Sequence, residues 1–220
     1  MITPEGWNTL VVDTANVAMT LANMPKGQFE EFAGEEKTEI GMDMAKWKNV
    51  LDVMKDPKCT ITIECPKDSG KIHITDGKYA YKIALLDVNT VRKRPTQPNI
   101  SLPAAIVIDA KEFHDTIKAL GVIGDKAHFT TCKEGLTLET EGDTDNLRKV
   151  LAAMDGSKIP EAPISSIFSL DYLRDISKAM KEAGTITVHL GQDHPVRVDF
   201  EIDGIEASFL VAPRISEDGQ

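Results

Sequence analysis

Met180-Lys181, followed by Thr185-Ile186-Thr187-Val188, is the stretch that organises this sequence, because its pattern occurs twice. The earlier copy is Met54-Lys55, followed by Thr60-Ile61-Thr62-Ile63. In both copies a helical spacing of apolar residues gives way to the alternation that is typical of a half-buried strand. The copies lie about 125 residues apart, and a pattern that recurs in this way indicates an internal repeat.

A second pair of landmarks has the same order and a similar spacing. Glu5-Gly6 precedes Asp13-Thr14 near the start, and Glu134-Gly135 precedes Asp143-Thr144 in the second half. Each match alone is short enough to arise by chance, but their common order favours duplication. The sequence therefore predicts two similar halves.

Each half combines strands with helices, so the predicted fold class is α+β with antiparallel sheets. Alternating apolar and polar residues, bounded by turn residues, predict the strands. These are 60–64, 71–75, 79–85, 104–108, 126–131, 185–190, 196–202 and 206–211. Helical periodicity predicts helices at about 43–55, 110–120 and 170–182.

The domain organisation follows from the repeat. We expect an N-terminal domain at 1–86, an extended linker at 87–103 that contains three prolines, and a C-terminal domain at 104–220. A strand, a helix and a strand precede Glu134-Gly135, whereas four residues precede Glu5-Gly6. We therefore expect the first half to lack about 26 residues at its start, relative to the second.

Composition limits the classes of function. The chain has 220 residues, 41% of them hydrophobic, and its 25 basic and 35 acidic side chains give a net charge of −10. This balance excludes a uniformly basic coat for nucleic acid but allows a basic patch on an acidic body. The sequence shows no membrane-length apolar stretch and no signal-peptide layout, so we expect a soluble intracellular protein. The three cysteines, Cys59, Cys65 and Cys132, indicate neither a disulfide framework nor a zinc site.

Motifs for catalysis are scarce. The histidines at 73, 114, 128, 189 and 194 have no metal-binding spacing, and the chain has no phosphate-binding glycine loop. Asp143 and Asp145 could bind a metal ion, although residues of this kind more often satisfy backbone amides in a turn. We expect no enzyme and no cofactor, and we keep a metal-dependent DNA-modifying enzyme as the alternative.

The helices carry the clearest functional pattern. Arg174, Lys178 and Lys181 fall on one stripe of the helix at 170–182, opposite its apolar stripe. Lys48 with Lys55, and Lys111 with Lys118, have the same arrangement on the other two helices. Each pattern alone could be a solvated face, but its recurrence on three helices favours a surface that follows phosphates without reading bases.

Several motifs together resemble the sliding clamps of the proliferating cell nuclear antigen family, of the archaeal type. The motifs occur in family order along nearly the whole chain. They are 12–19 (Val-Asp-Thr-Ala-Asn-Val-Ala-Met), 85–88 (Leu-Leu-Asp-Val), 141–144 (Glu-Gly-Asp-Thr), 168–173 (Phe-Ser-Leu-Asp-Tyr-Leu) and 210–215 (Leu-Val-Ala-Pro-Arg-Ile). Family members open with a strand and a lysine-bearing helix, and this chain begins after both.

The resemblance implies a processivity factor for DNA polymerase that acts in DNA replication and repair. Two similar domains per subunit, and three identical subunits, would close a ring around duplex DNA, with the helices inside and the sheets outside. Partners would be polymerase, clamp loader, flap nuclease and ligase, without a membrane, in the cytoplasm on chromosomal DNA. The expected DNA-facing residues are Lys118 and Lys178, which match family positions, with Lys48, Lys55, Lys111, Arg174 and Lys181.

The resemblance also implies two protein interfaces. Ring closure would pair an edge strand near 78–86 of one subunit with a strand near 146–153 of the next. The expected interface residues are Tyr79, Tyr81, Ile83, Leu147, Arg148, Lys149 and Leu151. Partner proteins would dock a glutamine-headed peptide in a partner pocket formed by Val12, Asn16, Val91, Pro195, Leu210, Val211, Ala212 and Pro213. A ring-defective relative that binds partner peptides without encircling DNA is a further alternative.

Overall fold

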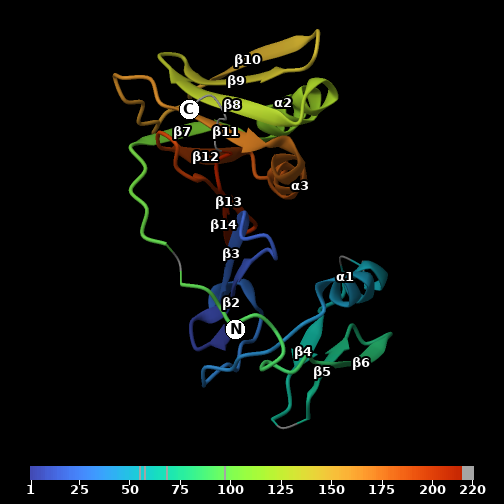
Figure 1. The fold of residues 1–220 in the computed structure, drawn as a ribbon. Coiled ribbons are helices and arrows are strands. Elements are labelled where there is room, and N and C mark those ends of the chain that lie inside the picture. Colours follow the sequence, from blue (N-terminus) through green and yellow to red (C-terminus); the bar gives the residue numbers. More distant parts are fainter. Residues whose placement is uncertain (55, 57, 68, 97, 215–220) are drawn as a thin grey trace. The chain divides into compact units, whose positions relative to one another are not determined.

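The computed structural model describes residues 1–214, except residues 55, 57, 68 and 97. These residues divide into two compact units, which are considered one at a time. The first unit contains residues 1–4 and 33–94, and the second contains residues 5–32 and 95–220. Figure 1 shows the elements of each unit in sequence colours.

The second unit consists of two antiparallel sheets and two α-helices. Its elements are β2 (Gly6–Val12), β3 (Ala18–Pro25), the 3-10 helix η1 (Lys26–Gln28), β7 (Ala104–Asp109), α2 (Ala110–Ile123), β8 (Lys126–Cys132), β9 (Gly135–Glu141), β10 (Asn146–Ala152), β11 (Ser165–Ser169), α3 (Leu170–Met180), β12 (Thr185–Leu190), β13 (Val196–Ile202) and β14 (Ile205–Val211). In the larger sheet these strands follow the order β2-β3-β14-β13-β12-β7, and the smaller sheet has the order β10-β9-β8-β11.

The core of this unit lies where both sheets and both helices meet. Helix α2 contacts β7, β9 and β10, whereas α3 contacts β11, β13 and β14. Three fully buried phenylalanines connect these layers, since the Phe129 ring lies edge-on to Phe113 of α2 and to Phe168 of β11. Such packing buries large apolar area and is the main term that stabilises the unit.

The predicted repeat is visible in two hairpins of this unit. Gly6 opens β2 opposite Pro25 of β3, and Gly135 opens β9 opposite Ala152 of β10. Both glycines have positive φ, 140° and 147°, and a Cβ on either would lie within 2.3 Å of a partner-strand carbonyl oxygen. The same strained, crowded position therefore recurs in both halves, and glycine occupies it each time.

The first unit is smaller. It contains β1 (Ile2–Thr3), α1 (Met44–Val53), β4 (Thr62–Glu64), β5 (Lys71–Thr75) and β6 (Ala80–Ala84). The strands β4, β5 and β6 pair in that order. The buried apolar side chains of this unit are Val50, Met54, Ile72, Ile74 and Ile83. The Asp43 carboxylate caps α1 by accepting hydrogen bonds from the amides of Ala45 and Lys46.

The predicted fold class is confirmed, and most predicted elements have the expected bounds. The helix predicted at 110–120 extends to Ile123, because Gly121 is tolerated inside it. Strands β2, β3, β9 and β11 were absent from the prediction. The sequence of β9 does alternate, at Leu136-Thr137-Leu138-Glu139, so this strand had a local signal that the prediction did not use.

The predicted linker has little regular structure. A turn at Asp87 is closed by the Thr90 amide, and the described residues of 91–103 contain no helix or strand. Among the described residues, no helix has both the length and the apolar character needed to cross a membrane.

Candidate nucleic-acid interface and partner pocket

Helices α2 and α3 lie side by side (Figure 1). Their inner faces are fully or almost fully buried, through Phe113, Ile117 and Leu120 on α2 and residues such as Leu173 and Met180 on α3. The predicted cations lie on the opposite faces. Lys111, Lys118, Arg174 and Lys178 are all exposed, as is Lys181 just after α3. The helical wheel therefore assigned these faces correctly.

Acidic neighbours accompany most of these cations. Lys111 binds Asp115 with 2.7 Å between Nζ and Oδ2, and Lys178 binds Asp175 at 2.9 Å. Arg174 pairs with Asp171, and Lys181 pairs with Glu182 at 3.4 Å. The hydrogen bond between Asp115 and Lys111 lowers the pKa of Asp115 and raises that of Lys111. The surface is therefore a mixed one, in which carboxylates such as Asp115 share the stripe with the cations, as the helical wheel indicates.

Lys118 differs from its neighbours, because it takes part in no ion pair among the described residues. In the first unit, Lys48 of α1 is exposed and binds Asp52 at 2.5 Å. Lys55 lies outside the described residues. Solvent screens exposed ion pairs of this kind, so they are weak and can exchange partners with a phosphate.

The predicted interface strands both lie at sheet edges. Strand β10 ends the order β10-β9-β8-β11, and β6 ends the order β4-β5-β6. Ile83 and Leu151 point into the cores of their own units, so only the backbone of these two residues is available for a contact. The remaining predicted residues are exposed or half-buried, namely Tyr79, Tyr81, Leu147, Arg148 and Lys149.

A groove of about 530 Å³ runs between β10 and α2. Leu147, Arg148 and Lys149 line one side, and Thr116 and Ala119 line the other. Lys149 binds Glu112 of α2 at 2.8 Å, which holds the edge strand beside the helix. The groove leaves the outer backbone of β10 open to a further strand.

The partner pocket is centred on one row of the large sheet. Leu210 lies opposite Met19, which lies opposite Val12 in the next strand. Residues directly opposite each other share a face, so these three side chains form a continuous apolar row, in which Val12 and Met19 are half-buried and Leu210 is 8% exposed. Met19 was not among the predicted pocket residues, although it ends the quoted motif at 12–19. Pro195, Ala212 and Pro213 are half-buried, and Asn16 is exposed with a φ of 59°.

Two predicted pocket residues have other placements. Val211 follows Leu210 on β14 and therefore points to the opposite face, into the core, with 1% of its surface exposed. It cannot contact a docked peptide as predicted. Val91 belongs to the first unit and is half-buried there, so its part in the pocket remains a prediction.

Hydrogen bonds hold the segments around this pocket. The Ala212 amide donates to the Val17 carbonyl oxygen at 2.8 Å, and the Arg214 amide donates to Ile167 at 2.7 Å. The Arg214 guanidinium also binds Asp125 at 2.7 Å, and this hydrogen bond lowers the pKa of the Asp125 carboxyl. The sequence analysis did not identify Asp125, because it lies far from the pocket residues along the chain.

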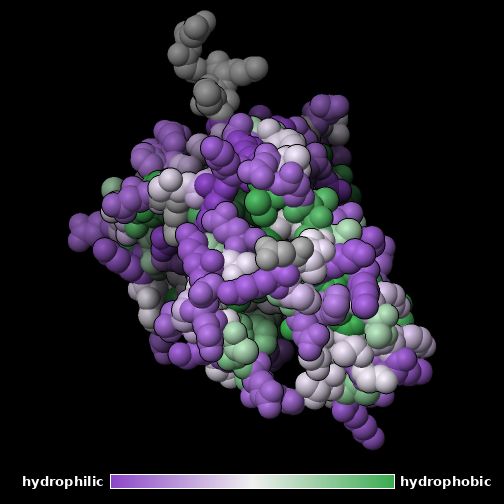
Figure 2. Space-filling view, turned by 90° about the horizontal axis from the view of Figure 1, so that it is seen from below, coloured by the Kyte–Doolittle hydropathy of each residue, from purple (hydrophilic) through white to green (hydrophobic). Residues whose placement is uncertain are grey.

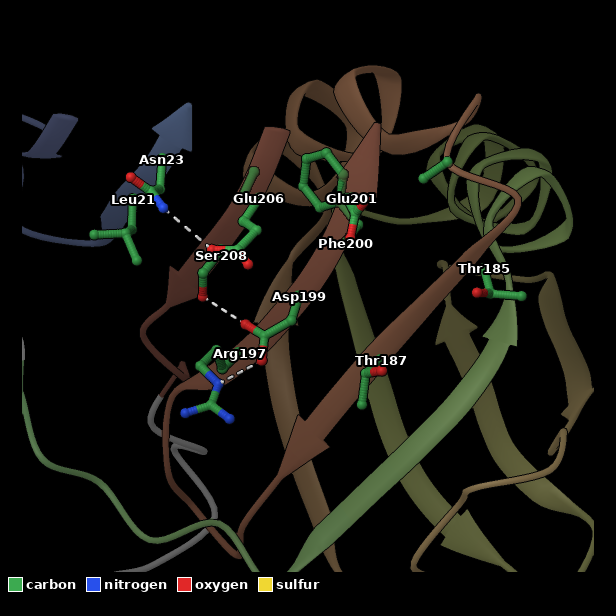
Figure 3. Close-up of a pocket in the computed structure, with 12 residues that line it drawn as sticks. Leu21, Asn23, Thr185, Thr187, Arg197, Asp199, Phe200, Glu201, Glu206 and Ser208 are labelled. Atoms are coloured by element: carbon green, nitrogen blue, oxygen red, sulfur yellow. Dashed lines mark hydrogen bonds and ion pairs between the residues drawn. The ribbon is translucent and has the colours of Figure 1, made fainter. Parts of the chain in front are cut away.

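A polar groove of about 570 Å³ adjoins the pocket row on the same sheet. Figure 3 shows Asp199 at its centre, between Arg197 and Ser208, while Asn23 points to Glu206. Burial opposes ionisation of Asp199, but hydrogen bonds from His189 and Ser208 and the Arg197 charge lower its pKa. The Asp199 carboxylate is thus well supported, whereas Nε of Arg197 is buried and forms an ion pair with Asp199 at 3.1 Å without a hydrogen bond among the described residues.

The described residues contain no group of three or more His, Cys, Asp or Glu side chains placed to hold a metal ion. Asp145 accepts a hydrogen bond from the Gly142 amide through its carbonyl oxygen, which closes the turn between β9 and β10.

Hydrophilic residues cover most of the face in Figure 2, with apolar residues in small patches between them.

Comparison with known proteins gives consistent matches. Residues 96–215 match the C-terminal domain of proliferating cell nuclear antigen. The chain is 39% identical over 211 residues to a DNA polymerase sliding clamp of Methanospirillum hungatei, covering 94% of this chain and 85% of that protein. It is 34% identical to the clamp of Archaeoglobus fulgidus, covering 97% of this chain and 87% of that one.

Solved structures agree with these matches. The A. fulgidus PCNA bound to the C-terminal region of FEN-1 superposes with a TM-score of 0.87 and 32% identity, covering 99% of this chain and 89% of that chain. The PCNA of Thermococcus kodakaraensis superposes with a TM-score of 0.86 and 23% identity, covering 97% and 88% of the two chains.

Proposed function

Because the chain belongs to the proliferating cell nuclear antigen family of DNA polymerase sliding clamps, we propose that it encircles duplex DNA as a non-catalytic processivity factor. The observation that carries this proposal is the pair of helices α2 and α3, which bury their apolar faces together and present Lys118 and Lys178 outward. Cations on a rigid helix surface can follow the phosphate backbone of any sequence.

The mixed charge of this surface suits sliding. Each DNA-facing cation except Lys118 has a carboxylate beside it among the described residues. A phosphate must compete with that carboxylate, so each contact is weak and is readily exchanged for the next one. We expect a clamp that retains DNA by enclosing it, not by tight binding.

Ring closure would use the two edge strands, and the internal repeat gives their register. Within the second unit, Ser208 of β14 lies opposite Leu21 of β3. The matched hairpins align Pro25 with Ala152, so Leu21 corresponds to Arg148 of β10.

The sheet partners identify the other strand in the same way. In the repeat, Ile63 corresponds to Val188, so their partners in the neighbouring strands, Ile74 and Val198, correspond as well. The next strand pairings, of β5 with β6 and of β13 with β14, then make Ala80 of β6 the counterpart of Ser208 of β14. If β6 of one subunit pairs with β10 of the next as β14 pairs with β3, Ala80 lies opposite Arg148. Three identical subunits joined head to tail would close such a ring.

Partner proteins would dock at the apolar row of Val12, Met19 and Leu210. The resemblance implies a glutamine-headed peptide that is carried by polymerase, clamp loader, flap nuclease and ligase. The solved complex of A. fulgidus PCNA with the C-terminal region of FEN-1 supports a flap nuclease among these partners. This role places the protein in the cytoplasm, on chromosomal DNA.

The experiment reverses two charges on the DNA-facing helices. We expect Lys118→Glu together with Lys178→Glu to reduce the stimulation of a DNA polymerase on primed circular DNA by about tenfold at moderate salt. The reason is that both side chains are exposed on helices whose opposite faces form the core, so the fold stays intact while phosphate attraction is lost.

The control makes the same change in net charge elsewhere. Lys133→Glu with Lys158→Glu alters two exposed lysines that lie outside both helices. Equal stimulation by the helix variant and by this control would contradict the DNA-facing role.

A further inference from the structure

Tyr172 connects helix α3 to the turn between β2 and β3, which spans residues 13–17. Its hydroxyl donates a hydrogen bond to Oδ2 of Asp13 at 2.9 Å. The two residues are 159 positions apart in the chain, and the Tyr172 ring is packed against the core of the second unit. The contact therefore joins a rigid helix to a surface turn.

The Asp13 carboxylate organises that turn. Its Oδ1 accepts hydrogen bonds from the amides of Val17 at 2.8 Å and Ala18 at 2.9 Å, and Oδ2 accepts one from Ala15 at 3.3 Å. Asn16, between these amides, has a left-handed φ of 59°, a conformation that needs support from its surroundings. The hydrogen bonds from Ala18 and Tyr172 lower the pKa of Asp13, so the carboxylate is charged at neutral pH.

The same turn carries part of the partner pocket. Val12 immediately precedes it and Asn16 lies within it. The carbonyl oxygen of Val17 accepts the hydrogen bond from Ala212, so the turn also holds the opposite wall of the pocket. We propose that Tyr172 is a positioning residue for partner docking, which acts through Asp13 on the turn between β2 and β3. This inference rests on the proposed function, because that function supplies the docked peptide.

The test removes the hydroxyl alone, through Tyr172→Phe. We expect the amides of Val17 and Ala18 to exchange with solvent about fivefold faster or more, because the carboxylate that accepts them loses its anchor. We expect the affinity for a glutamine-headed docking peptide, measured by calorimetry, to fall about fivefold, which corresponds to the typical net contribution of one hydrogen bond. The melting temperature should change little.

Ser177→Ala is the matched control. It removes a hydroxyl from the same helix, but one that binds His114 of α2 at 2.9 Å and not the turn. This variant should leave peptide affinity and the exchange of Val17 and Ala18 as they are in the parent.

An NMR titration of the Asp13 carboxyl distinguishes a role of Tyr172 in positioning Asp13 from a general loss of order in the turn. The hydrogen-bond donors that lower the pKa of this carboxyl include the three amides of its own turn and, from α3, the Tyr172 hydroxyl. Loss of that donor should raise the pKa of Asp13 in Tyr172→Phe, and peptide affinity should then decline at a higher pH on acidification than in the parent.

The outcomes are separable. Failure of the parent protein to bind the peptide would contradict the proposed docking function. A parent that binds, with Tyr172→Phe matching it in affinity or in exchange at Val17 and Ala18, would overturn the positioning role alone.

Discussion

Adjacent residues of one strand have opposite roles around the partner pocket, because successive side chains of a strand point to opposite faces. Leu210 shares a face with Met19 and Val12, whereas Val211 is buried in the core. Substituting Val211 would therefore report on stability and not on docking. Docking is better tested at Val12, which lies on the pocket face, with its neighbour Val11 on the other face as the control, since Val11 is 53% exposed.

At this scale we predict that Val12→Asp weakens binding of a glutamine-headed peptide by at least about tenfold. The added carboxylate would lie among the apolar anchors of the peptide, where burying a charge without a partner is costly. Calorimetry with the purified protein measures the effect.

Val11→Asp is the control, since it places the same charge on the other face of β2. We expect its affinity to stay within about twofold of the parent. If both variants lost affinity equally, the pocket would not lie on the face of Val12, Met19 and Leu210.

At the scale of elements, β10 and β6 are two of the strands at sheet edges, and they are the two that the proposed ring would pair. Strand β10 has its outer backbone free beside the groove along α2, and β6 ends the small sheet. Exposed edges of this kind promote pairing with another chain. The repeat specifies which residues should meet, through the internal pairing of β3 with β14.

We predict that Ala80→Cys with Arg148→Cys forms an intersubunit disulfide, in a background in which the native cysteines are serine. Side chains directly opposite in antiparallel strands have Cβ atoms about 4.5–5.5 Å apart, close enough for this bond after small adjustments. Non-reducing electrophoresis after mild oxidation should show cross-linked dimers and trimers.

The comparison pair is Ala80→Cys with Lys149→Cys. A shift of one residue turns the second side chain to the other face of the strand, so this pair should stay uncross-linked. Efficient cross-linking of the shifted pair, with none at Arg148, would rule out the register derived from the repeat.

At the scale of the whole molecule, the two units differ in how much apolar surface they bury. The second unit has one continuous cluster that includes Phe113, Phe129 and Phe168. In the first unit five apolar side chains are buried, while Met44 and Val53 of α1 are 65% and 51% exposed. Stability follows buried apolar area, so the first unit should open more easily.

We predict that the amide of Ile74 exchanges with solvent at least about tenfold faster than that of Val198. These residues occupy matched positions of the repeat, and both side chains are buried, so the comparison reports on the units and not on local exposure. Hydrogen exchange followed by NMR measures both rates in one sample. Equal protection of the two amides would show that the first unit is stabilised by contacts beyond its own core.

Much of this organisation could be predicted from sequence, where a pattern is local. Helix faces follow from a period of 3.6 residues, so the buried stripe with Phe113, Ile117 and Leu120 was correct, and so were the exposed cations. Strands with one buried face, such as β5 and β12, have the predicted bounds. Strand β9 was missed although Leu136-Thr137-Leu138-Glu139 alternates, so burial on both faces does not explain its absence from the prediction.

The site was predicted less completely. The sequence identified the residues of the pocket motifs, but a motif does not state which neighbour faces a ligand. Val211 was therefore placed in the pocket and Met19 was omitted. The pairing of β14 with β3 decides both positions, and it joins segments about 190 residues apart.

What the sequence determined by itself is the repeat, the α+β class, the amphipathic helices and the motifs of the family, since each depends on the order and spacing of nearby residues. What only the tertiary structure decided is which side chains from distant segments meet, since pairs one helical turn apart, such as Asp115 with Lys111, follow from local spacing. Tyr172 contacts Asp13 because the folded sheet brings together two segments that are 159 residues apart in the chain. No local sequence pattern encodes a contact over that distance.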